Sequence, residues 1–368
     1  MRVLIDPQIF NHQLNGGISR YISTLISGLR KFQDVSVCCP VLVSDNHFVP
    51  TFSNSIRWLN PLFHKLSDNP GLLNFRLNNL MLKANLADIF IPSFYDTYFF
   101  NSLGRVKVIL PIHDMIHEKY PDFISGSEKV IKNKKKLIKR ADHIIAVSEN
   151  TKKDLLAIYK EINPEKVSVI YHGNSIKHDE LSASINSDQH LERYFLFVGL
   201  RGGYKQFDWL VESIADILIN RNISLLCIGG SVFTEMEQVK LRALNVFDRV
   251  KIVKANDEEL KMFYKNATAL LFPSFYEGFG FPIIESMSCG CPVVLNTGSC
   301  FPEIASHAGY FYEFGDVQGI QKNIYSILDD NQKTKIMIEL GIEIAKRFTW
   351  ENCLTETNQV LKTVYENG

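Results

Sequence analysis

Short apolar runs rich in valine and isoleucine recur along the chain, and amphipathic helical patterns separate many of them. In 207–220, for example, the apolar side chains share one face at a spacing of about 3.6 residues. This strand–helix rhythm predicts an α/β fold, in which helices cover both faces of a parallel sheet. The expected strands are 3–5, 35–43, 88–91, 106–110, 143–147, 167–170, 194–198, 223–228, 250–253, 269–272 and 293–295.

The rhythm pauses once, in the polar stretch 174–190, which has the composition of a linker. It resumes in the second half of the chain, so the sequence predicts two α/β domains with a cleft between them. Ligands of such sheets bind beyond the carboxyl ends of the strands. Functional residues are therefore expected in the loops that follow strands.

Charge and cysteine usage exclude several classes of protein. The 368 residues carry 40 basic and 40 acidic side chains, and this balance argues against a nucleic-acid partner. The seven cysteines form no CxxC pair, which favours reduced thiols over a disulfide frame or a zinc site. No run of about 18 uncharged apolar residues exists. We therefore expect a cytoplasmic protein that does not span a membrane.

The segment 274–292, SFYEGFGFPIIESMSCGCP, follows an expected strand. Gly278 and Gly280 allow a tight turn, and Pro282 suits the first turn of a helix whose free N–H groups can bind an anion. Glu277 before this helix and Glu285, expected in its first turn, suit the hydroxyls of a sugar and a ribose. Alternatively, Glu285 caps the helix and Glu277 is a solvated loop residue; the residues alone leave both readings open.

The same segment resembles the two-glutamate signature, EGFGxPxxE followed by GxPVV, of the retaining GT-B glycosyltransferases of family 4 (glycosyl transferases group 1). The resemblance is to the bacterial polysaccharide and O-antigen type. It implies two Rossmann-like domains that face each other across a cleft. Glu277 would then contact the transferred sugar and Glu285 the ribose, while the backbone of Gly278, Phe279 and Gly280 would touch sugar and phosphates.

Arg201 and Lys205 lie between an expected strand and an expected helix. Two cations beside a helix N-terminus suit a diphosphate, although they could equally be ordinary surface residues. The family resemblance implies that this pair stabilises the departing nucleoside diphosphate. The chain has no Asp-x-Asp triplet, so we expect neither a metal nor another cofactor.

Two further loops belong to the first half of the chain. Gly16 and Gly17 follow the first strand and allow backbone amides to approach a phosphate, and they resemble the family's G-G-I-x-R-Y loop, which closes over the donor. His113 and Asp114 follow another strand and match the family's His-Asp pair. The resemblance implies that His113 hydrogen-bonds the sugar and that Asp114 lies near the acceptor, whereas a lone histidine is more often structural.

Further predictions concern two single residues and two longer stretches. Ser148, at the end of a strand, is expected to line the cleft near the acceptor, and the nucleotide base is expected near Lys254. The basic stretch 129–140 carries seven cations and no acid, and it suits either an anionic membrane surface or a solvated helix face. The aromatic run in 94–100 is either core or part of an acceptor surface.

The resemblance divides the chain into an acceptor-side domain (1–175), a linker (176–192), a nucleotide-sugar-binding domain (193–346) and a helix (347–368) that returns to the first domain. It implies a retaining, metal-independent hexosyltransferase acting in cell-surface polysaccharide assembly, with a glycan or lipid-linked acceptor. GDP-mannose is the first candidate donor and UDP-hexoses are the next. The alternatives are a nucleotide-sugar epimerase of the same fold and an inactive sugar-nucleotide-binding protein. A peripheral position on the inner face of the membrane is the expected location.

Overall fold

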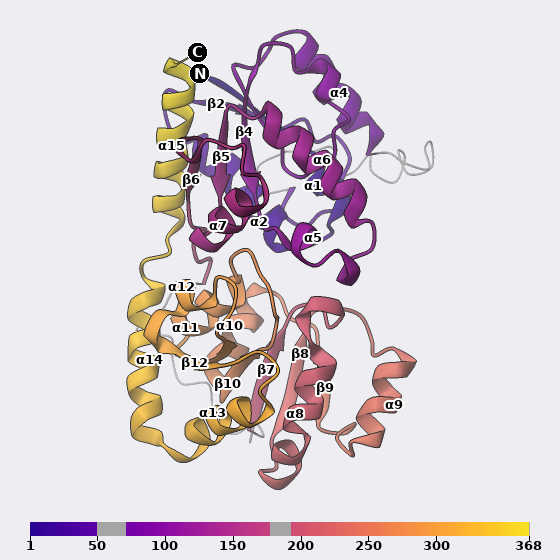
Figure 1. Cartoon of the computed structure of the whole chain (residues 1–368), viewed down its shortest axis with the longest axis vertical. Helices are drawn as coiled ribbons and strands as arrows, with labels where there is room; N and C mark the ends of the chain where they lie inside the picture. Colours follow the sequence, from indigo (N-terminus) through magenta and orange to yellow (C-terminus); the bar gives the residue numbers. More distant parts are fainter. Residues whose placement is uncertain (50–70, 177–192, 368) are drawn as a thin grey trace. The chain divides into compact units, whose positions relative to one another are not determined.

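The computed structural model describes residues 1–49, 71–176 and 193–367. The chain divides into two compact units (Figure 1). Unit 1 comprises Met1–Gly173 and Trp350–Gly368, and unit 2 comprises Asn174–Thr349. Most of the expected linker, 176–192, lies outside the described residues.

Unit 1 is built on a six-stranded sheet with the order β2-β1-β3-β4-β5-β6, in which each neighbouring pair is parallel. Its strands are β1 (Arg2–Ile5), β2 (Ser36–Cys38), β3 (Ile89–Ile91), β4 (Lys107–Ile112), β5 (His143–Ala146) and β6 (Val167–Val169). Its helices are α1 (Ile9–His12), α2 (Gly17–Leu29), α4 (Leu72–Lys83), α5 (Ile116–Lys119), α6 (Ser127–Arg140), α7 (Glu149–Ile158) and α15 (Trp350–Glu366), with 3-10 turns η3 (Phe100–Ser102), η4 (Pro121–Phe123) and η5 (Pro164–Lys166).

The last helix, α15, is part of unit 1 although it is distant in sequence. Its buried Cys353, Leu361 and Val364 join the same apolar core as β1 and α2. A Cβ atom on Gly28 of α2 would lie 2.3 Å from Leu354 Cδ1, so a larger residue there would require the Leu354 side chain to move. The chain termini lie close together as a result (Figure 1).

Unit 2 contains a second six-stranded parallel sheet with the order β12-β11-β10-β7-β8-β9. Its strands are β7 (Tyr194–Val198), β8 (Ser224–Ile228), β9 (Val250–Val253), β10 (Ala269–Phe272), β11 (Val293–Asn296) and β12 (Gly309–Tyr312). The helices are α8 (Phe207–Asn220), α9 (Glu235–Ala243), α10 (Asp257–Asn266), α11 (Phe281–Ser288), α12 (Phe301–Ala305), α13 (Val317–Asp329) and α14 (Asn331–Ala345), with 3-10 turns η6 (Gly203–Lys205) and η7 (Ser306–Ala308).

The predicted α/β class with two parallel sheets is confirmed. Two details of the prediction were wrong. The strand expected at 35–43 is limited to Ser36–Cys38, because it is followed by Pro40, which cannot donate a ladder hydrogen bond. The edge strand β12 was missed, since it pairs on one side only and depends on β11 for its ladder hydrogen bonds. All seven cysteines are free thiols. Within the described ranges, no helix combines the length and apolarity needed to cross a membrane.

Candidate active site

The carboxyl ends of β7 and β10 form the crossover point of the unit 2 sheet. From β7 the chain proceeds through α8 to β8 on one side, whereas β10 pairs with the opposite edge of β7. The loops that follow these two strands lie side by side, and the Phe275 N–H of one donates to the Tyr204 carbonyl of the other (3.1 Å). In sheets of this kind, ligands bind at such a crossover point. Lys205 comes from the first loop and Glu277 from the second.

Lys205 and Glu277 form an ion pair at this point, with 2.5 Å between Lys205 Nζ and Glu277 Oε1. Their side chains are only 13% and 14% exposed. The Glu277 backbone is held by Ser299 on the loop after β11, whose hydroxyl accepts from Glu277 N (2.9 Å) and donates to Glu277 O (2.7 Å). The structure thus brings two predicted catalytic residues together and holds the carboxylate in place.

Arg201, the third predicted catalytic residue in this unit, is held by the loop after β8. Its Nε donates to Glu237 Oε1 (2.9 Å), and its terminal nitrogens donate to the carbonyls of Gly229 (3.3 Å), Ser231 (2.7 Å) and Val232 (3.2 Å). Four of its five N–H groups are therefore engaged. The structure gives Arg201 a role in ordering 229–232, and its proposed contact with a diphosphate remains a prediction.

Gly280 precedes helix α11 and has a φ of +88°, in the left-handed region that favours glycine. Pro282 lies in the first turn, as expected. Glu285 does not: α11 begins at Phe281, so Glu285 lies in the second turn and does not cap the helix. It is 4% exposed and accepts a hydrogen bond from the Tyr264 hydroxyl (3.1 Å).

Phe279 and Lys254 occupy different environments. Phe279, between the two glycines of the loop, is buried, and its ring packs edge-on against Phe281 and Phe348. Its carbonyl accepts a hydrogen bond from the Cys300 thiol, which anchors the 278–280 backbone. Lys254 is an exposed side chain just after β9. Its contact with a nucleotide base stays a prediction.

In unit 1, His113 follows β4 and is buried. Its backbone N–H donates to the Tyr95 hydroxyl (2.9 Å), and its Nε2 lies 3.3 Å from the carbonyl oxygen of Ser93. Burial lowers the pKa of His113 to about 4, so the imidazole is neutral at physiological pH. A neutral histidine fits a hydrogen-bonding role toward a sugar hydroxyl.

Asp114 is partly exposed, and its carboxylate accepts from the Ile116 N–H (3.1 Å). Burial opposes ionisation, but His117, 3.9 Å away, and the Lys134 ammonium lower the pKa of Asp114 to about 2. The carboxylate is therefore ionised at neutral pH, so it can accept a hydroxyl hydrogen bond but is a weak general base.

The other predicted residues of unit 1 have local backbone roles. Gly16 and Gly17 stand at the start of α2, where the Gly16 carbonyl accepts from the Ser19 hydroxyl (3.0 Å). Ser148 is buried and caps α7 by accepting from Thr151 N (3.1 Å). Its hydroxyl is therefore engaged in the cap, and its expected place in the cleft near the acceptor stays a prediction.

Two of the seven cations in the basic helix α6 are not exposed: one is Lys134, and the other is Arg140, which is partly buried and donates to Asp142 (2.9 Å) and to the Val106 carbonyl (2.6 Å). Lys134 is 0% exposed and donates to Glu118 (2.8 Å) and to the Asp114 carbonyl (3.1 Å). It therefore faces inward and supports the His113–Asp114 loop. The exposed cations of the helix are Lys129, Lys132, Lys135, Lys136 and Lys139.

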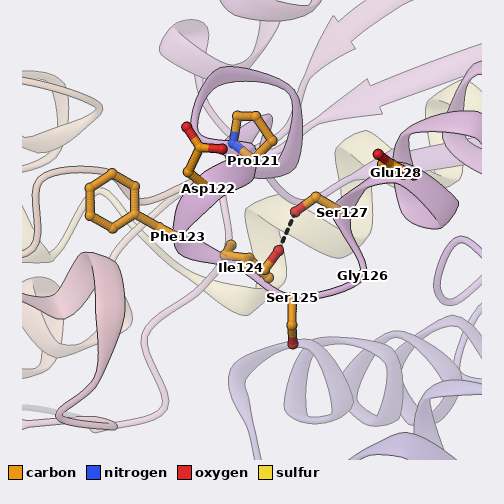
Figure 2. Close-up of a pocket in the computed structure, with 8 residues that line it drawn as sticks. All are labelled: Pro121, Asp122, Phe123, Ile124, Ser125, Gly126, Ser127 and Glu128. Atoms are coloured by element: carbon orange, nitrogen blue, oxygen red, sulfur yellow. Dashed lines mark hydrogen bonds between the residues drawn. The ribbon is translucent and has the colours of Figure 1, made fainter.

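Figure 2 shows a pocket at the start of α6, lined by residues 121–128. Within it, the Ser127 hydroxyl donates to the Ile124 carbonyl (2.7 Å). The lining residues are consecutive in the chain, so this pocket belongs to the turn before the helix and brings no distant groups together. None of the predicted site residues lines it.

Sequence reasoning missed several supporting residues. Asp6, Ser93 and Tyr95 surround His113 or its loop, and Tyr264 contacts Glu285. Two sequence signals point to such residues. Asp6 directly follows the first expected strand, and the Gly-Gly pair after β8 marks the loop whose carbonyls bind Arg201. Tyr264 offered no local signal, because it lies in the last turn of α10 and its partner is 21 residues away in sequence.

Residues 15–176 match the family model "Glycosyltransferase Family 4", and residues 180–343 match "Glycosyl transferases group 1". O-antigen chain mannosyltransferase B of Escherichia coli is 42% identical over 106 residues, which cover 29% of this chain and 28% of that protein. O-antigen chain mannosyltransferase RfbU of Salmonella typhimurium is 29% identical, covering 59% and 60%. The chain thus spans less than two thirds of the length of these curated relatives.

The fold also matches solved structures. The structure of Anabaena Alr3699/HepE in complex with UDP-glucose superposes with a TM-score of 0.74 at 18% identity, and the match covers 99% of this chain and 100% of that one. At this identity the similarity concerns the fold. The two family models, which adjoin along the chain, carry the assignment together with the paired parallel sheets. The chain belongs to the family 4 (group 1) glycosyltransferases of GT-B fold.

Proposed function

We propose that the protein transfers a hexose from a nucleotide-sugar to a hydroxyl of a saccharide or lipid-linked glycan, with retention at the anomeric carbon. The observation that carries this proposal is the Lys205–Glu277 ion pair at the crossover point of the unit 2 sheet. The pair supports the proposal because a cation suited to a diphosphate lies beside a carboxylate suited to sugar hydroxyls. Glu285, buried in the following helix, is the proposed ribose ligand.

The proposed reaction is a front-face displacement. The acceptor oxygen forms a bond to the anomeric carbon, the bond from that carbon to the phosphate oxygen breaks, and the acceptor proton passes to the leaving phosphate oxygen. Lys205 offsets the charge that develops on the diphosphate, and the Arg201 guanidinium is proposed to contribute to the same positive field, so we propose a metal-independent enzyme. Positioning and electrostatics supply most of the catalysis.

The proposed donor is GDP-mannose, because two similar proteins are named O-antigen mannosyltransferases. UDP-hexoses are the second candidates, since a protein of the same fold was solved with UDP-glucose. An epimerase is disfavoured by the names of these relatives. An inactive binding protein is disfavoured by the intact Lys205, Glu277 and Glu285 set. The proposed setting is cell-surface polysaccharide assembly.

The test has two steps. A panel of nucleotide-sugars is first scored by thermal shift, because a bound donor raises the unfolding midpoint. The stabilising donor is then used to measure acceptor-dependent release of nucleoside diphosphate. Lys205→Ala and Glu285→Ala should each lower turnover at least about tenfold, or about 1.4 kcal/mol. Lys335→Ala and Glu339→Ala, exposed residues of α14, serve as controls. Near wild-type transfer by both site variants would refute the site.

We also propose that the exposed lysines of α6 dock on an anionic membrane surface, at the inner face of the membrane. Like charges at helical spacings of three and four repel one another, and an anionic surface relieves this repulsion. Each lysine contributes about 1 kcal/mol near such a surface. Replacing Lys129, Lys132 and Lys136 by glutamine should reduce sedimentation with phosphatidylserine vesicles in low salt.

The control variant replaces three exposed lysines of the same unit by glutamine, and so makes the same change in net charge: Lys153, Lys160 and Lys166. Binding that is insensitive both to salt and to the α6 substitutions would contradict the membrane proposal.

A further inference from the structure

Asp6 is a buried carboxylate to which the proposed chemistry assigns no role. It follows β1 and is 0% exposed. Its oxygens accept hydrogen bonds from the Gln8 side-chain amide, from the Tyr98 hydroxyl (2.5 Å), and from the backbone N–H and hydroxyl of Ser93 (both 3.3 Å). Within the part of the chain that the structure describes, no cation pairs with it. Neutral donors alone therefore stabilise this carboxylate, at a cost in desolvation.

These bonds tie the segment 93–98 to the end of β1. The Ser93 hydroxyl also accepts from the Ile9 N–H (3.1 Å), and Gln8 Oε1 accepts from the Asp96 N–H (2.7 Å). Asp6 and Gln8 thus hold both ends of the turn that contains Tyr95.

The same turn holds His113 from two sides. The Tyr95 hydroxyl accepts the His113 backbone N–H, and the Ser93 carbonyl lies 3.3 Å from His113 Nε2. A carbonyl oxygen can only accept, so Nε2 must carry the proton of the neutral ring. Nδ1 then has the lone pair, and this buried atom has no hydrogen-bond partner among the described residues. A hydroxyl donor would satisfy it.

We infer that Asp6 is a positioning residue, which fixes His113 as the Nε2–H tautomer through Ser93 and so presents Nδ1 as an acceptor for a hydroxyl of the bound substrate. The inference rests on the proposed function for the identity of that hydroxyl, but the tautomer itself is independent of it. The groups that face Asp6 are Tyr98 and the Cys39 thiol, neither of which is charged at neutral pH.

The first measurement is the tautomer of His113, read from long-range ¹H–¹⁵N correlations of histidine-labelled protein, with His113→Gln to assign the signals. In the wild type we expect a neutral Nε2–H ring at pH 7. In Asp6→Asn, an NH₂ group replaces one carboxylate oxygen, and it faces groups that are themselves hydrogen-bond donors. The bonds to Ser93 should therefore weaken, and both His113 tautomers should appear. The control is Asp88→Asn, which weakens the ion pair and hydrogen bonds of the Asp88 carboxylate with Arg2, at the other end of β1 from Asp6.

The second measurement is turnover with the stabilising donor. Asp6→Asn should lower kcat at least about tenfold while changing nucleotide affinity less than about twofold, because the nucleotide site lies in unit 2. Wild-type tautomer signals and wild-type kcat in Asp6→Asn would overturn the inference. If the wild type transfers no sugar, the proposed function fails, and the tautomer spectra still decide the role of Asp6.

A titration of the wild type covers the case in which Asp6→Asn does not fold. Burial raises the pKa of Asp6 to about 6, whereas the pKa of His113 is lowered to about 4. The His113 ring signals should therefore show a step near pH 6 while the ring stays neutral, and a second step near pH 4. If the Asp6 carboxyl signal titrates while the His113 ring signals show no matching step, Asp6 does not act on His113.

Discussion

The Lys205–Glu277 ion pair holds a carboxylate where a diphosphate is proposed to bind, and this predicts opposite effects for its two halves. In the free protein Glu277 pairs with the Lys205 ammonium, so a bound phosphate has to compete with this carboxylate for Lys205. Glu277→Gln removes that competition without changing the shape of the side chain. It should strengthen the binding of a nucleoside diphosphate that lacks the sugar, and weaken sugar transfer. Lys205→Met should weaken both.

The magnitudes follow from the charges. With about 6 Å between the Glu277 carboxylate and the nearest phosphate, and an effective dielectric of about 50, the repulsion is about 1 kcal/mol. Its removal corresponds to about fivefold tighter binding. Lys205→Met leaves Glu277 unpaired at 14% exposure, which should cost about 2 kcal/mol of unfolding free energy. The double variant has no unpaired charge, so its stability should lie within about 1 kcal/mol of the wild type.

Calorimetric titration with GDP and UDP measures the affinities. Urea unfolding followed by tryptophan fluorescence measures stability, since Trp209 stacks on Tyr312 within unit 2 (ring centroids 5.7 Å apart). Lys335→Met on α14 is the matched lysine control. The reasoning is refuted if Glu277→Gln binds both nucleotides more weakly than the wild type, or if Lys205→Met binds them equally well.

Three further predictions concern stability. Arg201→Ala removes four hydrogen bonds and leaves its carboxylate partner unpaired, so urea unfolding should show a loss of about 3 kcal/mol; a loss below about 0.5 kcal/mol would mean that these bonds do not order the loop. Gly280→Ala places a Cβ atom 2.9 Å from an isoleucine methyl at φ +88°, so it should lower the unfolding midpoint more than Gly315→Ala, where φ is +83° but no atom lies within 4 Å. Equal shifts in the unfolding midpoint would mean that the methyl contact costs nothing and that both variants lose only about 1–2 kcal/mol through backbone strain. Burial raises the pKa of Asp6 from 3.8 to about 6, so the folded state binds more protons between these values and loses about 3 kcal/mol as the pH rises from 4 to 7. The difference in unfolding free energy between wild type and Asp6→Asn should fall over that range, and a constant difference would contradict the shift.

The strand pattern of the chain was readable because it is local. Strands β7, β9 and β10 begin and end where their apolar runs do. The edge strands were the exceptions. β12 depends on β11 for its hydrogen bonds, and β2 is cut short by a proline, so neither length follows from hydrophobicity alone.

The candidate site was predictable as two separate motifs, each at a strand end. That Lys205 and Glu277 meet across 72 residues depends on β10 pairing with β7, which is a property of sheet order. The place of Glu285 in the second turn of α11 depends on where that helix starts, and Gly280 determines this through its left-handed backbone. Its Tyr264 partner comes from another helix.

Charge shows the same division. By itself the sequence determined that α6 is basic and amphipathic. It also determined that strands in both halves of the chain are followed by polar loops, because periodicity and residue chemistry act over a few neighbours. Only the tertiary structure decided that Lys134 is buried against Glu118 while its neighbours face solvent, and that Asp6 is buried without a cation. Burial and charge partners come from distant segments, so the environment that tunes a titratable group is a property of the packed molecule.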